Sequence, residues 1–463
     1  MESIHSYKRS IRIVACLIML CVGLILLGAC TETIVVQELS SVDAEPIEIQ
    51  ELPYVTSEQL VSAVNYEELD MLREQAKQGY ATAQTDLGIR YLHGHGITQD
   101  YEQALYWTIK AVEQDYATAQ TSLGAMYLTG AGVIQSYEQA LYWYRKAIEQ
   151  GYAHAQAYLG AMYFMGFGVT QNLEQALYLY RSAANQGSYA GQVHLGIMYF
   201  LGLGVEQSYE QAMYWYREAA EQNTPSAQNN LGGMYLSGLG VEQSCVQAAF
   251  WFRQAAEQGY VMSQHNLGIL HSNTRGVEHS FEQAVYWFRR AAEQGHIAAQ
   301  YDIGLMYEIG RGIMQSYEIA AYWFRKASEQ GHSDAQYSLG RLYHHGLGVN
   351  QNFEQAEYWY RKAIGQGDTW AMLNLGTMYI SGTGVAQDYE QAMYWFRNAA
   401  EQNRPMAKSN IGWMYHNGLG VEQSYEQAAL WYRDAITHAT AQGDNNALGQ
   451  AQANQAALPV QYR

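Results

Sequence analysis

The chain has 463 residues, of which 48% are hydrophobic, enough to bury a large core or several domains. Its 26 Lys and Arg residues against 44 Asp and Glu residues give a formal net charge of −18. This balance argues against a nucleic-acid partner, because phosphate binding depends on clustered Lys and Arg side chains. The 40 tyrosines and 43 glycines, with only five prolines, indicate one small unit copied many times.

Residues 1–29 are predicted to be a lipoprotein signal peptide. Lys8, Arg9 and Arg12 precede an uncharged apolar run that ends in "LLGAC" at Cys30. A leucine, two small residues and then a cysteine resemble the bacterial lipobox. The resemblance implies cleavage before the cysteine and lipidation of its thiol and new amine. Several acyl chains give stable anchoring that a single chain does not.

The alternative for the same stretch is an uncleaved transmembrane helix, because the apolar run is about long enough to span a bilayer. By resemblance to enteric lipoproteins, Thr31 after the cysteine implies transport to the outer membrane. The expected location is therefore the cell envelope, as an outer-membrane lipoprotein facing the periplasm or the surface. The inner membrane is the location under the alternative.

Residues 30–65 are acidic and weakly apolar, which predicts a flexible tether. Cys16 and Cys21 lie in the signal peptide and Cys30 carries lipid in this interpretation, so Cys245 is alone. No intramolecular disulfide framework is then expected.

From residue 66 to residue 436 one pattern recurs. "A-Q-x-x-L-G-x-x-Y" and close variants of it repeat every 36 residues, first at Ala83–Tyr91 and last at Ala407–Tyr415. Within the copy at 117–152, Ala119, Leu123 and Tyr127 are spaced to form one apolar stripe of a helix, called helix A here. A second stripe follows in the same copy and predicts helix B.

Helix B has clear end signals in every copy. Each copy has a preferred N-cap residue at the same place: Asp100, Ser136, Asn172, Ser208, Ser244, Ser280, Ser316, Asn352, Asp388 and Ser424. A residue suited to a left-handed C′ position closes most copies: Gly151, Gly187, Asn223, Gly259, Gly295, Gly331, Gly367 and Asn403. The sequence therefore predicts two short helices in each copy.

A G-x-G motif lies between the two helices, as at Gly130 and Gly132. Such glycines can hold a phosphate or permit a turn. No Lys follows them, and Ser136 already caps the next helix. They are therefore predicted to be turn residues with positive φ. One copy has Thr274 in place of the first glycine, and its turn is expected to be the most distorted.

Two short helices cannot bury their own apolar faces, so neighbouring copies must stack into an all-α, α/α superhelical solenoid of about ten helix-turn-helix repeats over residues 66–436. Residues 66–78 resemble a lone helix B and are expected to cover the first repeat. The Ala/Gln/Asn-rich tail, residues 437–463, is expected to fray and become disordered.

The recurring "A-x-x-x-L-G-x-x-Y-x-x-G-x-G-V" and "A-x-x-W-Y-R-x-A-A-E-Q-G" resemble the Sel1-like repeat, a relative of the tetratricopeptide repeat. Members of this family are solenoids that act as adaptors and scaffolds, so the resemblance implies a non-enzymatic protein without a cofactor. β-Lactamase or penicillin-binding activity is attributed to cysteine-rich members, and this chain lacks those cysteines.

Two columns of helix A vary between copies while their neighbours do not. The first column is Thr85, Thr121, Ala157, Val193, Asn229, His265, Tyr301, Tyr337, Leu373 and Ser409. The second column, four residues on, is Ile89, Ala125, Ala161, Ile197, Gly233, Ile269, Leu305, Arg341, Thr377 and Trp413. In tetratricopeptide-like stacks the A helices line the concave side, so we expect a partner protein or peptide to bind there.

The partner-binding residues are predicted to be His265, Ile269, Tyr301, Leu305, Tyr337, Arg341, Leu373 and Trp413, because aromatic and Arg side chains often dominate binding energy. The alternative is that both columns are unconstrained solvent positions. On helix B the triplet Tyr142–Tyr144 spans too wide an arc to face one neighbour, so one of its columns is expected to be partly exposed.

The sequence contains no H-E-x-x-H, C-x-x-C, G-x-S-x-G or Walker motif. His93 with His95 and His344 with His345 come closest to metal spacing, and we interpret both pairs as turn histidines. We therefore expect no catalytic residue, no metal and no cofactor, and an envelope or secreted protein as partner. The alternative functions are binding or hydrolysis of cell-wall glycan or β-lactam, and interaction with a host cell.

Overall fold

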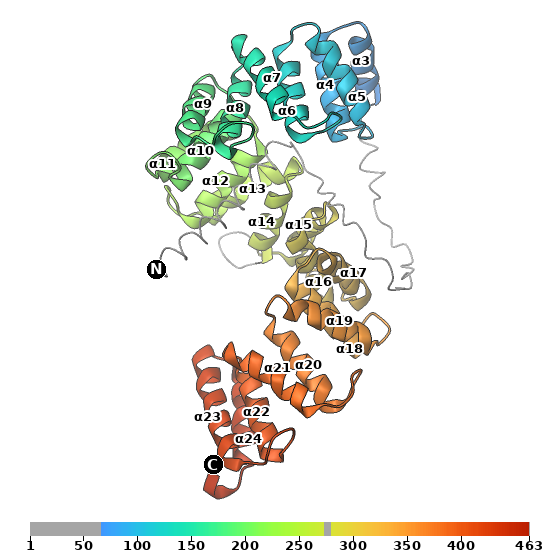
Figure 1. Ribbon diagram of the computed structural model, residues 1–463, viewed down its shortest axis with the longest axis vertical. Coiled ribbons are helices and arrows are strands. Elements are labelled where there is room, and N and C mark those ends of the chain that lie inside the picture. Colours follow the sequence, from blue (N-terminus) through green and yellow to red (C-terminus); the bar gives the residue numbers. More distant parts are fainter. Residues whose placement is uncertain (1–65, 273–278, 463) are drawn as a thin grey trace. The chain divides into compact units, whose positions relative to one another are not determined.

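The computed structural model describes residues 66–272 and 279–462 of the chain. The predicted signal peptide, Cys30 and the tether lie outside the described residues, as does the turn that contains Thr274. Within the described ranges the chain forms α-helices and a short 3-10 helix, with no strand (Figure 1).

The helices alternate as the sequence predicts. The A helices are α4 (Ala81–His93), α6 (Ala117–Thr129), α8 (Ala153–Met165), α10 (Tyr189–Leu201), α12 (Pro225–Ser237), α14 (Val261–Ser272), α16 (Ile297–Ile309), α18 (Ser333–His345), α20 (Thr369–Ser381) and α22 (Pro405–Asn417). The B helices are α5 (Tyr101–Val112), α7 (Tyr137–Glu149), α9 (Leu173–Asn185), α11 (Tyr209–Glu221), α13 (Cys245–Glu257), α15 (Phe281–Glu293), α17 (Tyr317–Glu329), α19 (Phe353–Ile364), α21 (Tyr389–Glu401) and α23 (Tyr425–Gln442).

The chain divides into two compact units, Met1–Tyr260 (unit 1) and Val261–Arg463 (unit 2). Within each unit every A helix packs on the B helix that follows it, and that B helix packs on the next A helix. This is the stacking that defines an α/α solenoid. The sequence alone did not indicate the division.

Both ends of the stack carry an additional helix. At the N-terminal end α3 (Tyr66–Lys77) buries Leu69 against Leu87 of α4, which confirms the predicted covering helix. At the C-terminal end the expectation of a disordered tail is wrong. The tail forms α24 (Asn445–Ala456) and the 3-10 helix η1 (Val460–Tyr462).

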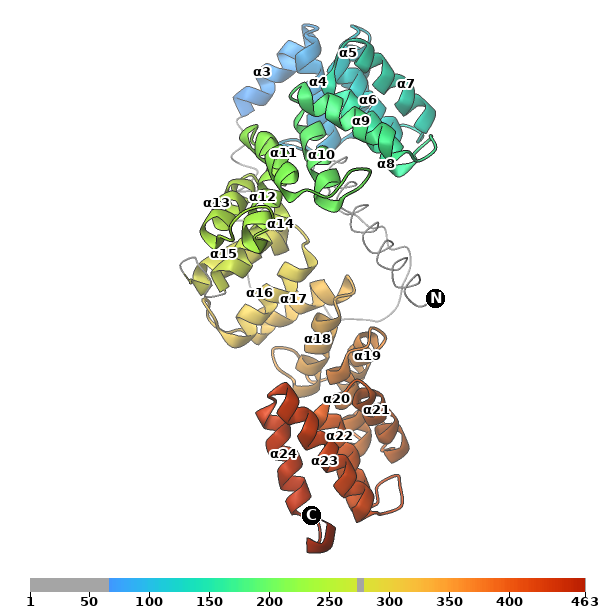
Figure 2. The same ribbon diagram turned by 90° about the vertical axis from the view of Figure 1, so that its left-hand side faces the viewer.

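Helix α24 packs against both α22 and α23 (Figure 2). Its Ala447 and Ala451 are fully buried, because their small side chains let the helix approach its neighbours closely. Asp444 caps its first turn, with the Ala447 N–H donating to Oδ1 at 2.9 Å. The composition of the tail suggested disorder, but its alanines allow α24 to pack closely against α22 and α23.

The predicted caps of helix B are all present. In each copy the side chain before helix B accepts a hydrogen bond from a backbone N–H of the first turn. The predicted C′ residues all have positive φ, and Asp115 takes this role in the first copy with φ of 57°. The caps therefore fix both ends of helix B in each repeat.

The described G-x-G glycines are turn residues. Gly310 ends α16 with φ of 73°, and Gly312 follows with φ of 67°. A Cβ on Gly312 would also overlap the backbone of Phe281 in the preceding helix B. Backbone conformation and close packing, rather than phosphate binding, explain the motif.

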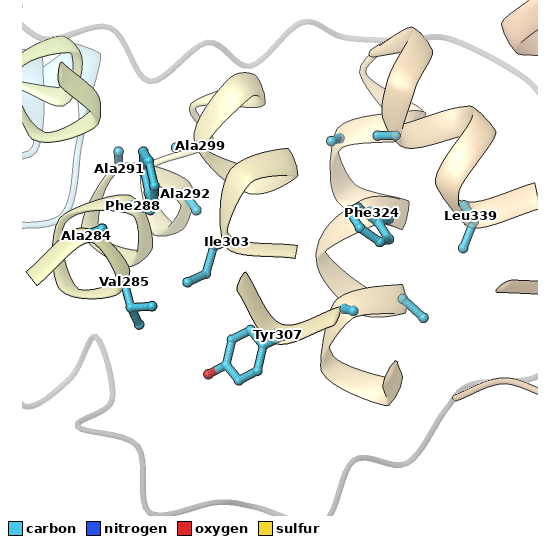
Figure 3. Close-up of a cluster of buried hydrophobic side chains, with 14 of the residues drawn as sticks. Ala284, Val285, Phe288, Ala291, Ala292, Ala299, Ile303, Tyr307, Phe324 and Leu339 are labelled. Atoms are coloured by element: carbon cyan, nitrogen blue, oxygen red, sulfur yellow. The ribbon is translucent and has the colours of Figure 1, made fainter. Parts of the chain in front are cut away.

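Aromatic rings of helix B fill the space that a glycine of helix A leaves open. In unit 2, Phe288 and Phe324 are buried with Ile303 and Leu339 in one cluster (Figure 3). A Cβ on Gly304 would lie 2.7 Å from the Phe324 ring. Gly124 has the same relation to Tyr144 in unit 1, at 2.6 Å.

Polar side chains bond adjacent repeats together. Gln336 of α18 is buried, donates to the Ser328 carbonyl at 3.1 Å, and accepts from Gln366 Nε2 at 2.9 Å. In six copies a helix-B arginine donates to the hydroxyl of a tyrosine in the next helix A: Arg181, Arg217, Arg289, Arg325, Arg361 and Arg397. These glutamine and arginine bonds recur because each repeat presents the same surface to the next.

The substitution Gln336→Ala should destabilise unit 2 by about 1–3 kcal/mol, because it leaves the Ser328 carbonyl and the Gln366 amide without this buried partner. Urea unfolding followed by far-ultraviolet circular dichroism measures the loss. Gln391→Ala on the exposed surface of α21 is the control and should change stability by less than about 0.5 kcal/mol. Equal effects of the two substitutions would contradict the role of Gln336.

Candidate functional site

The two variable columns of helix A differ in exposure. The first column is half-buried or buried, and Thr85, Thr121 and Val193 of unit 1 are at most 5% exposed. The second column is more open, since Ile269 is 36% and Trp413 is 37% exposed in unit 2. A variable position in this chain is therefore not always a surface position.

Leu373, one of the predicted binding residues, is only 5% exposed and packs in a core cluster with Met393 and Phe396. Its apolar side chain supports the surface from inside. The other seven predicted residues keep exposed or half-buried side chains on α14, α16, α18 and α22 of unit 2. We call this set the helix-A face: His265, Ile269, Tyr301, Leu305, Tyr337, Arg341 and Trp413.

His265 is held by the next A helix. Its Nε2 lies 2.8 Å from Oδ2 of Asp302 on α16, and its ring lies 4.5 Å from the ring of His296. Burial lowers the pKa of His296 to about 4, and burial also lowers the pKa of His332. His296 and His332 are therefore uncharged at neutral pH.

Tyr301 stacks on His332, with 4.7 Å between the ring centroids and 23° between the ring planes. Burial raises the pKa of Tyr301 to about 12, so its hydroxyl stays protonated at neutral pH. The contact joins α16 to the residue that caps α18. Leu305, one turn after Tyr301, packs partly on the core.

Tyr337 and Arg341 bind neighbours on either side of α18. The Tyr337 hydroxyl accepts a hydrogen bond from Asn374 Nδ2 at 3.4 Å, and Arg341 forms an ion pair with Glu308 of α16. Four of the predicted residues are thus linked to a neighbouring A helix through partners that were not themselves predicted: His265, Tyr301, Tyr337 and Arg341.

All of those missed partners except Glu308 belong to two further variable columns. One column directly follows the first column, and it includes Asp302 and Asn374. The other is the residue that precedes helix A: Tyr80, Tyr116, Tyr152, Ser188, Thr224, Tyr260, His296, His332, Asp368 and Arg404. Comparing the copies in these columns as well would have found them.

Helix B carries its own exposed column, as the aromatic triplet predicts. Tyr144 is fully buried, Trp143 is half-buried and Tyr142 is 48% exposed. Equivalent exposed side chains occur in the other copies: Tyr106, Tyr178, Tyr214, Phe250, Tyr286, Tyr322, Tyr358, Tyr394 and Leu430. A depression of about 300 Å³ beside Tyr142 is lined by α7 alone, from Glu138 to Glu149. It is a surface hollow of a single helix.

The described residues contain neither a candidate metal site nor a candidate membrane-spanning helix. Within residues 66–272 and 279–462, no group of three or more His, Cys, Asp or Glu side chains is arranged to hold a metal ion. In the same ranges no helix combines the length and apolarity that crossing a membrane requires.

A protein-family model, the Sel1 repeat, matches the chain in ten consecutive segments, from residues 81–116 to residues 405–438. The chain belongs to the Sel1 repeat family. Proteins of this family commonly mediate protein–protein interactions, and the repeat scaffold is typically non-enzymatic. The helix pairs, capped turns and repeat-to-repeat bonds described above are therefore those of a Sel1 solenoid.

Two solved structures of Sel1 proteins resemble the chain. The protective antigen c5321, present in uropathogenic Escherichia coli strains, is 36% identical, with 85% of this chain and 91% of that chain covered and a TM-score of 0.52. A Sel1 repeat protein from Oxalobacter formigenes is 31% identical, with 72% and 98% covered and a TM-score of 0.48. The comparison with curated proteins gave no match.

Proposed function

We propose that this Sel1 repeat protein is a lipid-anchored, non-enzymatic scaffold of the bacterial cell envelope that captures a protein or peptide on the helix-A face of unit 2. The observation that carries the proposal is the row of differing side chains on otherwise uniform helices. Ile269 and Trp413 expose apolar surface there, while Tyr301, Tyr337 and Arg341 add aromatic and polar groups. Such side chains often supply most of the energy of a protein interface.

The proposed location rests on separate support. The lipobox at Cys30 supports a lipid anchor, and residues 30–65 would hold the solenoid away from the membrane. The similar c5321 protein is a protective antigen, which fits an envelope location. The concave shape expected of the A-helix side would place the helix-A face around an extended segment of the partner.

Replacing Tyr301, Tyr337 and Trp413 together with alanine should reduce capture of the partner by at least about tenfold, because this removes central aromatic contacts. The measurement is affinity capture from bacterial membranes followed by mass spectrometry. Alanine at Ile269 and Trp413 alone, both exposed, gives a second variant with little effect on folding.

The control replaces three exposed tyrosines of helix B in the same unit, Tyr286, Tyr322 and Tyr358, with alanine. This set should leave capture unchanged. If both helix-A variants still captured the partner at the original level, the helix-A face would not be the binding surface.

A further inference from the structure

Three aspartates follow one another across the A helices of unit 2. Asp302 lies on α16, Asp334 lies in the first turn of α18, and Asp368 caps α20. Electrostatic interactions connect them: Asp302 and Asp334 both act on Tyr301 and on His332, and Asp334 acts on Asp368. Asp302 and Asp334 therefore lie near Tyr301 and His332, and Asp368 lies near Tyr337.

The protein balances these charges only in part. Asp302 contacts His265, and Asp368 accepts the Ala371 N–H at 2.7 Å. Asp334 is exposed, and within the described part of the chain no hydrogen bond or ion pair engages its carboxylate. An exposed carboxylate beside aromatic rings is a position where a ligand cation gains both an ion pair and a cation–π contact.

The cations of the same helices offset this excess only in part. Arg404, which precedes α22, interacts electrostatically with Asp368. Arg341 is paired with Glu308, a further carboxylate of α16. Lys408 on α22 is buried and forms an ion pair with Asp434 of α23 at 2.8 Å. The helix-A face therefore remains rich in carboxylates, and its nearby imidazoles at positions 296 and 332 are neutral at pH 7.

One intramolecular contact shows the chemistry that this surface offers. The guanidinium of Arg404 lies 4.4 Å from the ring centroid of Trp370. It also donates to Thr369 Oγ1, from Nε at 2.9 Å and from Nη2 at 2.6 Å. Here the protein already places an arginine beside an aromatic ring and an oxygen acceptor, close to Asp368.

We propose that the helix-A face of unit 2 recognises a cationic segment of its partner, an extended stretch whose Arg or Lys side chains reach Asp302, Asp334 and Asp368 between the rings of Tyr301, Tyr337 and His332. This inference rests on the proposed function and specifies that the bound segment of the partner is positively charged. Complementary charge selects the segment, and the aromatic rings contact its aliphatic stems and cationic ends.

The test uses the full-length chain in detergent and two fluorescein-labelled peptides of equal length. One alternates Arg with Ser, and the other has citrulline, a neutral analogue of similar shape, in place of Arg. Fluorescence anisotropy measures the dissociation constants. The arginine peptide should bind at least about tenfold more tightly than the citrulline peptide.

The isosteric triple variant Asp302→Asn, Asp334→Asn and Asp368→Asn should weaken binding of the arginine peptide by at least about tenfold. The matched control makes the same charge change on exposed helix-B positions: Glu318→Gln, Glu354→Gln and Glu390→Gln. This control should change binding by less than about twofold, which separates recognition from the general negative charge of the protein.

Equal binding of the two peptides, no binding of the arginine peptide, or equal effects of the two triple variants would overturn the inference. The scaffold function has its own readout, because capture of the membrane partner depends on Tyr301, Tyr337 and Trp413. If capture still required those residues while the peptides bound alike, the cationic specificity would be wrong and the scaffold function would stand.

Discussion

Replacing Phe324 with alanine should lower the local stability of unit 2 around α16 and α17 by about 3–5 kcal/mol. The Phe324 ring is fully buried in the cluster between helices of adjacent repeats, so its loss leaves a cavity and removes apolar burial (Figure 3). Hydrogen exchange read by mass spectrometry measures the opening of each helix, which suits a stack that can unfold in parts.

A partner substitution tests whether Phe324 fits because position 304 lacks a side chain. Gly304→Ala places a Cβ 2.7 Å from the Phe324 ring and should cost about 1–3 kcal/mol. Combined with Phe324→Ala, it should cost less than the sum of the two, because the new methyl group then has space. Gly233→Ala is the control, because its added Cβ would meet no atom within 4 Å beyond the adjacent residues and backbone of its own helix. It should stabilise α12 by up to about 1 kcal/mol. Additive losses would contradict the fit between Gly304 and Phe324.

Replacing Cys30 with serine should abolish fatty-acid labelling of the protein and leave the signal peptide attached. In proteins with a lipobox, lipid is attached to the thiol of this cysteine. The signal peptide is cleaved before the cysteine only after the lipid has been attached. Metabolic labelling with a fatty acid and mass spectrometry of the isolated chain measure both effects.

Cys245→Ser is the matched control and should retain label and processing, because Cys245 lies in helix B of a repeat. The alternative of an uncleaved transmembrane helix predicts a different result for Cys30→Ser. Under that alternative neither substitution alters labelling or signal-peptide processing, and the original chain carries residues 1–29.

The sequence predicted local structure well because the signals are local. The cap of helix B depends on one side chain and the backbone three residues on, so Ser316 and its equivalents reveal it directly. The glycine turns depend on φ at the residue itself, as at Gly310. The 36-residue repeat then supplies the stacking, since each surface meets the same partner surface.

The candidate site was predicted less completely because its contacts cross between repeats. Asp302 contacts His265, which lies 37 positions away in the sequence, and the sequence around either residue does not predict this contact. Leu373 shares a variable column with Tyr337, yet its apolar side chain turns into the core formed with the next helix B. Variation between copies selected the candidate surface, while the structure was needed to separate its exposed residues from its buried ones.

The bonds between repeats have a consequence for how such a chain changes length. Gln300 and Gln336 make the same bond to the preceding helix B in their respective repeats, to the Ala292 and Ser328 carbonyls. A recombination event that removes or duplicates a block of 36 residues within a unit therefore rejoins surfaces that already match. The terminal helices α3 and α24 would still cover the same first and last repeats. The length of the solenoid can therefore change by whole repeats while the fold of each repeat stays the same.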